Sequence, residues 1–186
     1  GGRYIGGMIG QQFGSMKNVK SYIPKEVGDP LGEDKTISIT VDSNLSNLSI
    51  GGLVGLFLNG VIDDAEIIAD ITIINCNSAK IGGLVGDSRD RIINSLATIA
   101  INIQESESGS GNAISVGGVV GDTTQSINNV TVDADIIINA KGTVTVGGIA
   151  GIATTIDDSE IAFAIDVINS VTTIAGGAAG SASGAL

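Results

Sequence analysis

Two Asp-Asp pairs, Asp63-Asp64 and Asp157-Asp158, are the residues of this sequence best suited to chemistry. The chain has no histidine and a single cysteine. A histidine-based catalytic triad and a zinc site built from imidazoles or several thiolates are therefore both excluded. Any catalysis or metal binding depends on carboxylates, and whether these carboxylates act together depends on the elements that carry them.

Each Asp pair belongs to a recurring segment: an aliphatic residue, a polar pair, two variable residues and a β-branched or aliphatic one. The four copies are IDDAEI (62–67), INSLAT (93–98), INNVTV (127–132) and IDDSEI (156–161). If the copies stack, their first polar column contains Asp63, Asn94, Asn128 and Asp157.

In such a stack the two Asp pairs lie roughly 14 Å apart, at about 4.8 Å per coil. That separation is too long for one calcium ion and exceeds the ~5–9.5 Å between glycosidase carboxylates. The pattern instead favours a structural ladder at a turn, because Asn and Asp tolerate left-handed backbone geometry and bond turn amides. Stacked Asn side chains can also bond from coil to coil. We expect no catalytic residue, no cofactor-binding residue and no metal site.

A glycine-rich hexad recurs in step with these segments. Its copies are IGGMIG (5–10), IGGLVG (50–55), IGGLVG (81–86), VGGVVG (116–121), VGGIAG (146–151) and a degenerate AGGAAG (175–180). Two insertions, at 22–34 and 105–112, lengthen the spacing where they occur, and removing them leaves a unit of roughly 30 residues.

The composition favours strands in each unit. Hydrophobic residues make up 42% of the chain but aromatic residues only 3%, so the apolar content is mainly Ile, Val, Ala and Leu. β-branched residues favour strands, and no window shows a sustained helical stripe. Short repeats of this kind bury a core only when stacked. We therefore predict an all-β parallel β-solenoid of about six coils, forming one domain over residues 1–186.

The hexad glycines have a structural explanation in this fold. We expect each hexad to be one extended strand whose faces are thinned by glycine, so that another layer can approach closely. The last glycine of a hexad can supply a positive φ that turns the coil. The predicted structural turn glycines are Gly7, Gly10, Gly52, Gly55, Gly83, Gly86, Gly118, Gly121, Gly148 and Gly151.

Charge and hydropathy restrict the partners. A net charge of −11 disfavours nucleic acid, whose phosphates it would repel. No apolar run is long enough to predict a membrane span.

Cys76 follows Ile73 and Ile74, which predicts a small buried hydrophobe. Five of the nine basic residues fall in the first 35 positions, namely Arg3, Lys17, Lys20, Lys25 and Lys35.

The hexads resemble the GLUG motif, a short Gly-Leu-variable-Gly signature. Residues 52–55 and 83–86 match it fully, and residues 7–10, 118–121 and 148–151 match with another aliphatic residue at the second place. The resemblance implies a non-catalytic repeat of large bacterial surface proteins, including immunoglobulin-A-cleaving metallopeptidases and adhesin-like chains. No catalytic residue carries over, because the motif contains none.

Three functions follow as hypotheses. The preferred one is a non-catalytic, extracellular structural or adhesive module of a cell-surface protein, which contacts protein or glycan surfaces through loops 22–34 and 105–112. The alternative is a subunit of an extracellular filament or sheath that stacks head to tail through open solenoid ends. A polysaccharide-cleaving β-helix enzyme is the least favoured.

Overall fold

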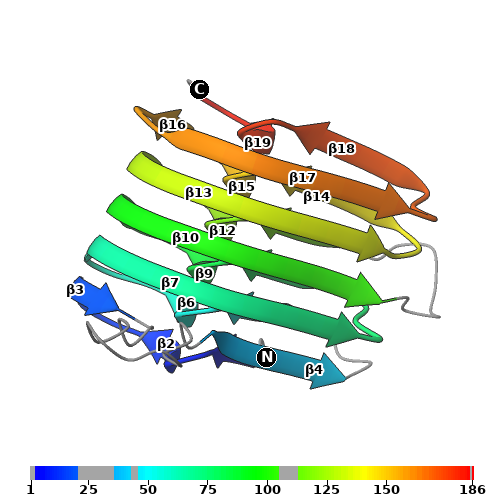
Figure 1. Cartoon of the computed structure of the whole chain (residues 1–186), viewed down its shortest axis with the longest axis horizontal. Coiled ribbons are helices and arrows are strands. Elements are labelled where there is room, and N and C mark those ends of the chain that lie inside the picture. The colour runs from blue at the N-terminus through cyan, green and yellow to red at the C-terminus, as the bar shows by residue number, and fades with distance from the viewer. Residues whose placement is uncertain (1–2, 21–35, 43–45, 105–112, 185) are drawn as a thin grey trace, which may run out of the picture.

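The chain forms an all-β solenoid, called here the rod for its stacked coils, in its computed structural model, which describes residues 3–20, 36–42, 46–104, 113–184 and 186. Three parallel sheets run along the rod, and successive coils add one strand after another to each sheet (Figure 1). The described residues contain no helix. The predicted parallel β-solenoid is confirmed.

Two sheets consist of short strands on either side of the hexads. The first hexad sheet contains β1 (Arg3–Gly6), β5 (Leu48–Gly51), β8 (Ala79–Gly82), β11 (Ala113–Gly117), β14 (Thr143–Gly147) and β18 (Thr172–Gly176). The second hexad sheet contains β2 (Ile9–Gln12), β6 (Val54–Phe57), β9 (Val85–Ser88), β12 (Val120–Thr123), β15 (Ala150–Ala153) and β19 (Ala179–Ala182).

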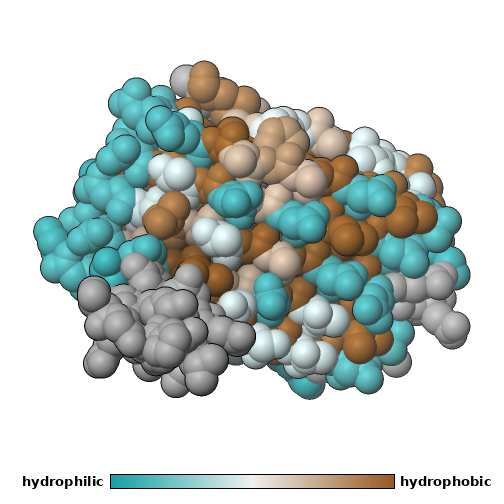
Figure 2. Space-filling model, viewed as in Figure 1, coloured by the Kyte–Doolittle hydropathy of each residue, from teal (hydrophilic) through white to brown (hydrophobic). Residues whose placement is uncertain are grey.

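The third sheet, called here the long sheet, forms the broad face in Figure 1. Its strands are β3 (Met16–Lys20), β4 (Ile37–Asp42), β7 (Val61–Ile74), β10 (Arg91–Gln104), β13 (Ser126–Asn139), β16 (Thr155–Asp157) and β17 (Glu160–Ile168). Both β3 and β4 pair with β7, and both β16 and β17 pair with β13. Figure 2 shows hydrophilic and hydrophobic residues interspersed over this face.

The rod has about four turns of about 31 residues, fewer than the about six coils expected from six hexads. The first hexad belongs to a coil whose long side is divided between β3 and β4, with residues 21–35 outside the described part. After the last hexad, no described strand returns to the long sheet. Only the four hexads between them begin complete turns.

Each hexad is a strand, a bend and a second strand, which corrects the expectation of one extended strand. In the hexad at 50–55, β5 ends at Gly51, Gly52 and Leu53 form the bend, and β6 begins at Val54. The bends are bonded from coil to coil, since Gly52 N–H donates to the Gly83 carbonyl at 2.9 Å and Leu53 N–H to that of Leu84 at 3.0 Å. The hexad is therefore a hydrogen-bonded corner between two sheets.

The core lies between the hexad corners and the long sheet. Stacked aliphatic residues fill it, and in one column Ile71, Ile101 and Ile136 are at most 1% exposed. Two columns of the long sheet lie opposite the bends, and in each coil one of them has a large side chain and the other has alanine. From coil to coil the pairs are Ile67 with Ala69, Ala97 with Ile99, and Val132 with Ala134. Each coil thus keeps one large and one small side chain there, and the volume is conserved.

The predicted burial of Cys76 is confirmed. Its side chain is fully buried in the core and unpaired. Burial raises the pKa of this thiol to about 11, against a smaller opposing effect of a backbone hydrogen bond. At neutral pH the residue is a protonated thiol that packs as a small hydrophobe.

Candidate functional site

The predicted polar ladder lies on the long sheet, but its register differs by one residue at one coil. Asp63 pairs with Ile93, Ile93 with Asn128, and Asn128 with Asp157. Asn94 therefore lies one position further along than predicted. Ile92 and Ile93 are alike in sequence, and burial of Ile92 against the core selects the register. Asp63 and Asp157 are three strand spacings apart, roughly 14 Å, so their carboxylates do not form one site.

The neighbouring column is the turn column, and Asn94 belongs to it. Its members adopt positive φ, between 46° and 58°, at Asn18, Asp64, Asn94, Asn129 and Asp158. In the β7, β10 and β13 coils, this left-handed residue lies inside a long strand, where it shifts the alternation of inward and outward side chains by one residue. Burial shows the shift, because Ile62 and Ala65 are both buried with two residues between them. The Asn and Asp residues therefore serve a repeated bulge.

Side chains of the two columns connect four coils. The Lys17 ammonium lies 3.0 Å from Asp63 Oδ2, and Asn94 Nδ2 donates to Asp63 Oδ1 at 2.8 Å. Asn129 Nδ2 in turn donates to Asn94 Oδ1 at 2.8 Å. The hydrogen bond from Asn94, and then that from Lys17, hold the pKa of Asp63 below its ordinary value. The carboxylate of Asp63 is therefore ionised at neutral pH and held by Lys17 and Asn94.

Serine hydroxyls support the bulge from the adjacent position. Ser95 Oγ accepts from Ala65 N–H of the preceding coil at 3.2 Å and donates to the Ile93 carbonyl at 2.7 Å. Ser159 accepts from Val130 N–H at 3.3 Å in the same way. In both cases the serine hydroxyl accepts from the backbone amide of the preceding coil, which has an apolar residue, Ala65 or Val130, at the position of the serine. This alternation was not predicted, although serine follows the polar position in two segments that lie two units apart, at Ser95 and Ser159.

The hexad glycines allow close approach, as predicted, but not through left-handed geometry. Positive φ at glycine occurs, within the described ranges, at Gly14, Gly60 and Gly142, none of which belongs to a hexad. The predicted positive φ at the last hexad glycine is therefore wrong. A Cβ added at the second glycine of a hexad would instead meet the carbonyl oxygen of the next coil. This contact is shared by Gly7, Gly52, Gly83, Gly118 and Gly148.

The last hexad glycines have a different neighbour. A Cβ on Gly86 would overlap backbone of β5, and one on Gly121 would overlap backbone of Lys80 and Ile81 in β8. A Cβ on Gly151 would overlap the Ser115 hydroxyl and the Val116 amide nitrogen of β11. The two hexad sheets therefore approach so closely that their backbones touch. At Gly55 a Cβ would meet Ile5 in the same manner, whereas Gly10 has its nearest atom at 3.1 Å.

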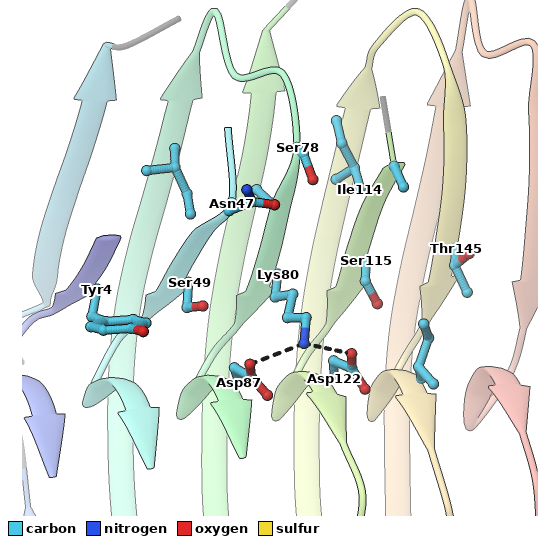
Figure 3. A pocket seen from close by; sticks show the side chains of 14 residues that line it. Tyr4, Asn47, Ser49, Ser78, Lys80, Asp87, Ile114, Ser115, Asp122 and Thr145 are labelled. Atoms are coloured by element: carbon cyan, nitrogen blue, oxygen red, sulfur yellow. Dashed lines mark hydrogen bonds and ion pairs between the residues drawn. The ribbon is translucent and has the colours of Figure 1, made fainter. Parts of the chain in front are cut away.

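A groove opens between the two hexad sheets, with a volume of about 310 Å³ (Figure 3). One wall carries the column Tyr4, Ser49, Lys80, Ser115 and Thr145 of the first hexad sheet. The opposite wall carries carboxylates and an isoleucine of the second hexad sheet, namely Asp87, Asp122 and Ile152. A second, more open depression of about 390 Å³ lies on the long sheet, where its lining includes Asp64, Asn94 and Asn129 of the turn column.

Lys80 bridges the two walls of the groove. Its Nζ lies 3.0 Å from Asp87 Oδ2 and 2.8 Å from Asp122 Oδ2, so one cation joins two neighbouring coils (Figure 3). Burial alone would lower the pKa of Lys80, but the bonds from Asp122 and Asp87 raise it above its ordinary value. This group of Lys80, Asp87 and Asp122 was not predicted. A signal was present, because an aspartate directly follows the hexads at 81–86 and 116–121.

The described residues contain no group of three or more His, Cys, Asp or Glu side chains arranged to hold a metal ion. They also contain no helix of the length and apolar character needed to cross a bilayer. The loops 22–34 and 105–112, to which binding specificity was assigned, lie outside the described residues. Comparisons with protein-family models, curated proteins and solved structures found no match to this chain.

Proposed function

We propose that this chain is a non-catalytic, extracellular structural or adhesive module of a cell-surface protein. The observation that carries the proposal is the use of its polar side chains. The side chains of Lys17, Asp63, Asn94 and Asn129 bond to one another from coil to coil, and Asn94 and Asn129 do so on the wall of an open depression of the long sheet. In the groove, Lys80 is likewise occupied by two carboxylates of the chain.

The resemblance of the hexads to GLUG repeats supports the surface assignment. A solenoid scaffold suits projection and contact, since recognition commonly resides in loops on a fixed scaffold. The carboxylate spacing supports the absence of catalysis, because Asp63 and Asp157 stand three strand spacings apart. No step of a hydrolase or lyase mechanism follows from this arrangement.

Antibody labelling of intact and permeabilised cells of the source organism tests the location. We expect intact cells to be labelled as strongly as permeabilised ones, and labelling only after permeabilisation would contradict the proposal. Incubation of the purified chain with acidic and neutral glycans tests the absence of catalysis. Cleavage that is lost when Asp63, Asp64, Asp157 and Asp158 are replaced by Asn would overturn it.

The filament alternative also has support from particular residues. The coil at the C-terminal end of the rod exposes large hydrophobic side chains, including Phe163, Ile168, Val171 and Ile174. Lys17 and Lys20 at the other end already pair with Asp63 and Glu66 of their own chain, so these lysines alone do not make a free basic end.

A further inference from the structure

We propose that the groove between the two hexad sheets binds a neutral sugar unit of a glycan. This inference deepens the adhesive form of the proposed function, and it rests on that function for its role in adhesion. Four features of the groove point to a sugar: its size, two unpaired hydroxyl groups, its charge and its apolar border.

The size of the groove suits a small ligand. Its volume is about 310 Å³, and small-molecule sites commonly occupy about 300–1,000 Å³. Four successive coils supply the side chains of one wall, at Ser49, Lys80, Ser115 and Thr145 (Figure 3). The groove therefore crosses the strands and offers groups from several coils to one ligand.

Two hydroxyl groups on this wall have no partner in the described part of the chain. Ser49 and Thr145 are only 5% and 9% exposed, and neither side chain forms a hydrogen bond to a described residue. Ser115 lies between them in the same wall, yet its hydroxyl donates to the Gly121 carbonyl. Buried polar groups are nearly always hydrogen-bonded, because an unpaired one costs free energy. A ligand that bonds Ser49 and Thr145 accounts for both.

The carboxylates of the opposite wall keep one oxygen each for a ligand. Lys80 lies 3.0 Å from Asp87 Oδ2 and 2.8 Å from Asp122 Oδ2. The Oδ1 atoms of these two aspartates accept no hydrogen bond from the described residues. They are therefore available to hydroxyl donors, and hydrogen bonds to a carboxylate are stronger than those between neutral groups.

The charge of the groove disfavours an anion. Lys80 contributes +1 and the two aspartates −2, which leaves −1, and the ammonium is already held by both carboxylates. A purely apolar ligand would leave Ser49 and Thr145 unpaired. A sugar fits, because each of its hydroxyl groups both donates and accepts. It can donate to the aspartates and accept from the serine and the threonine.

Apolar side chains border these polar groups. Ile152 is 37% exposed and follows Asp122 in its column. On the other wall Tyr4, which is 38% exposed, lies beyond Ser49 (Figure 3). The C–H faces of a sugar ring can pack against such side chains, and a tyrosine adds a hydroxyl beside its apolar ring. A few polar groups with an apolar border are typical of small-ligand sites.

Saturation-transfer difference NMR on the purified chain tests the proposal. The probes are glucose, galactose, mannose, fucose and the N-acetylhexosamines, each at millimolar concentration, with putrescine and acetate as charged comparisons. We expect at least one sugar to receive saturation from the protein. On titration, the backbone amide signals of Ser49, Lys80 and Thr145 should shift, whereas those of the long sheet should not.

Ser49→Ala with Thr145→Val removes the two unpaired hydroxyl groups with little change in volume. We expect the dissociation constant of the bound sugar to rise at least about tenfold. The melting temperature should stay the same or rise, because two unpaired buried hydroxyl groups are lost. The matched control is Ser38→Ala with Thr98→Val, the same changes at exposed positions of the long sheet, which should leave the affinity unchanged. Circular dichroism verifies that each variant folds.

Failure of every sugar in the panel to bind overturns the inference, and so does binding of putrescine or acetate alone. An affinity that Ser49→Ala with Thr145→Val leaves unchanged also overturns it, because the sugar then binds elsewhere. The surface-module proposal survives each of these results, since labelling of intact cells decides it. Conversely, labelling only after permeabilisation would contradict the surface role, while sugar binding by the groove would stand.

Discussion

At the scale of single residues, the stacking of coils depends on glycines, because a Cβ at these positions would overlap the next coil. The second hexad glycine faces the carbonyl of the next coil, and its amide donates to that same coil. Any side chain there would separate two bonded coils and also push into the long sheet, where Ile99 lies against Gly83. The requirement is for space, since φ at the hexad glycines is not left-handed.

Gly83→Ala should therefore destabilise the chain strongly. We expect a loss of about 3 kcal/mol or more, because the added methyl group meets backbone and a packed isoleucine that cannot both move. Chemical denaturation of dilute protein measures the effect. Gly177→Ala is the matched control in the last hexad, where a Cβ has open space, and it should change stability by less than about 1 kcal/mol. Equal losses at both sites would contradict the account.

Asp63 links stability to pH. Its pKa is lowered in the folded state, so its stabilising effect is present above the ordinary carboxyl pKa of 3.8 and is lost as the pH falls through the folded value. Asp63→Asn should lower the melting temperature at pH 7, and the difference from wild type should vanish in acid below that range. Asp135→Asn, at an exposed position outside the ion pairs described, is the control and should show no such convergence. A pH-independent difference at Asp63 would be evidence against the network.

At the scale of elements, the long strand with its internal bulge is the unit that repeats. Alternating isoleucines indicate such strands directly, and their stacking was predicted correctly. The exact register was not, because Ile92 and Ile93 offer the same side chain and only contact with the core distinguishes them. Similarly, the hexad pattern fits a straight strand as well as a corner, and the coil-to-coil bonds of Gly52 and Leu53 decide between them. The sequence pattern of one segment does not show which of its residues contact the neighbouring coils.

Substitutions at Asn94 separate the two roles of the turn column. Asn94 has φ of 49° and bonds to both neighbouring coils. Asn94→Gly keeps the backbone geometry and loses the bonds, while Asn94→Ala loses both, so we expect alanine to be less stable than glycine by about 1 kcal/mol. Thermal or urea unfolding measures this difference. At Asn102, within the extended part of β10, the order should reverse. The same order at both positions would contradict a left-handed bulge.

At the scale of the whole molecule, the columns of the three sheets continue through successive coils of the described chain. The solenoid fold and the stacking of the hexads could be predicted from spacing alone. The groove and its lysine could not, because Lys80, Asp87 and Asp122 meet only after two hexad sheets are folded against each other. The number of full turns also depended on the whole chain, since the first and last hexads do not begin complete ones.

The distance along one column tests the stacking most directly. Ser38, Asp70, Ala100, Asp135 and Ala164 share a column, so Ser38 and Ala164 stand four strand spacings apart, about 19 Å between backbones. Both are exposed, and nitroxide labels on cysteines placed there, with Cys76→Ala, can be measured by pulsed electron paramagnetic resonance in excess unlabelled protein. We expect one narrow distribution near 20 Å once the label arms are included. A broad distribution, or one centred well beyond 30 Å, would contradict a rod of coils in register.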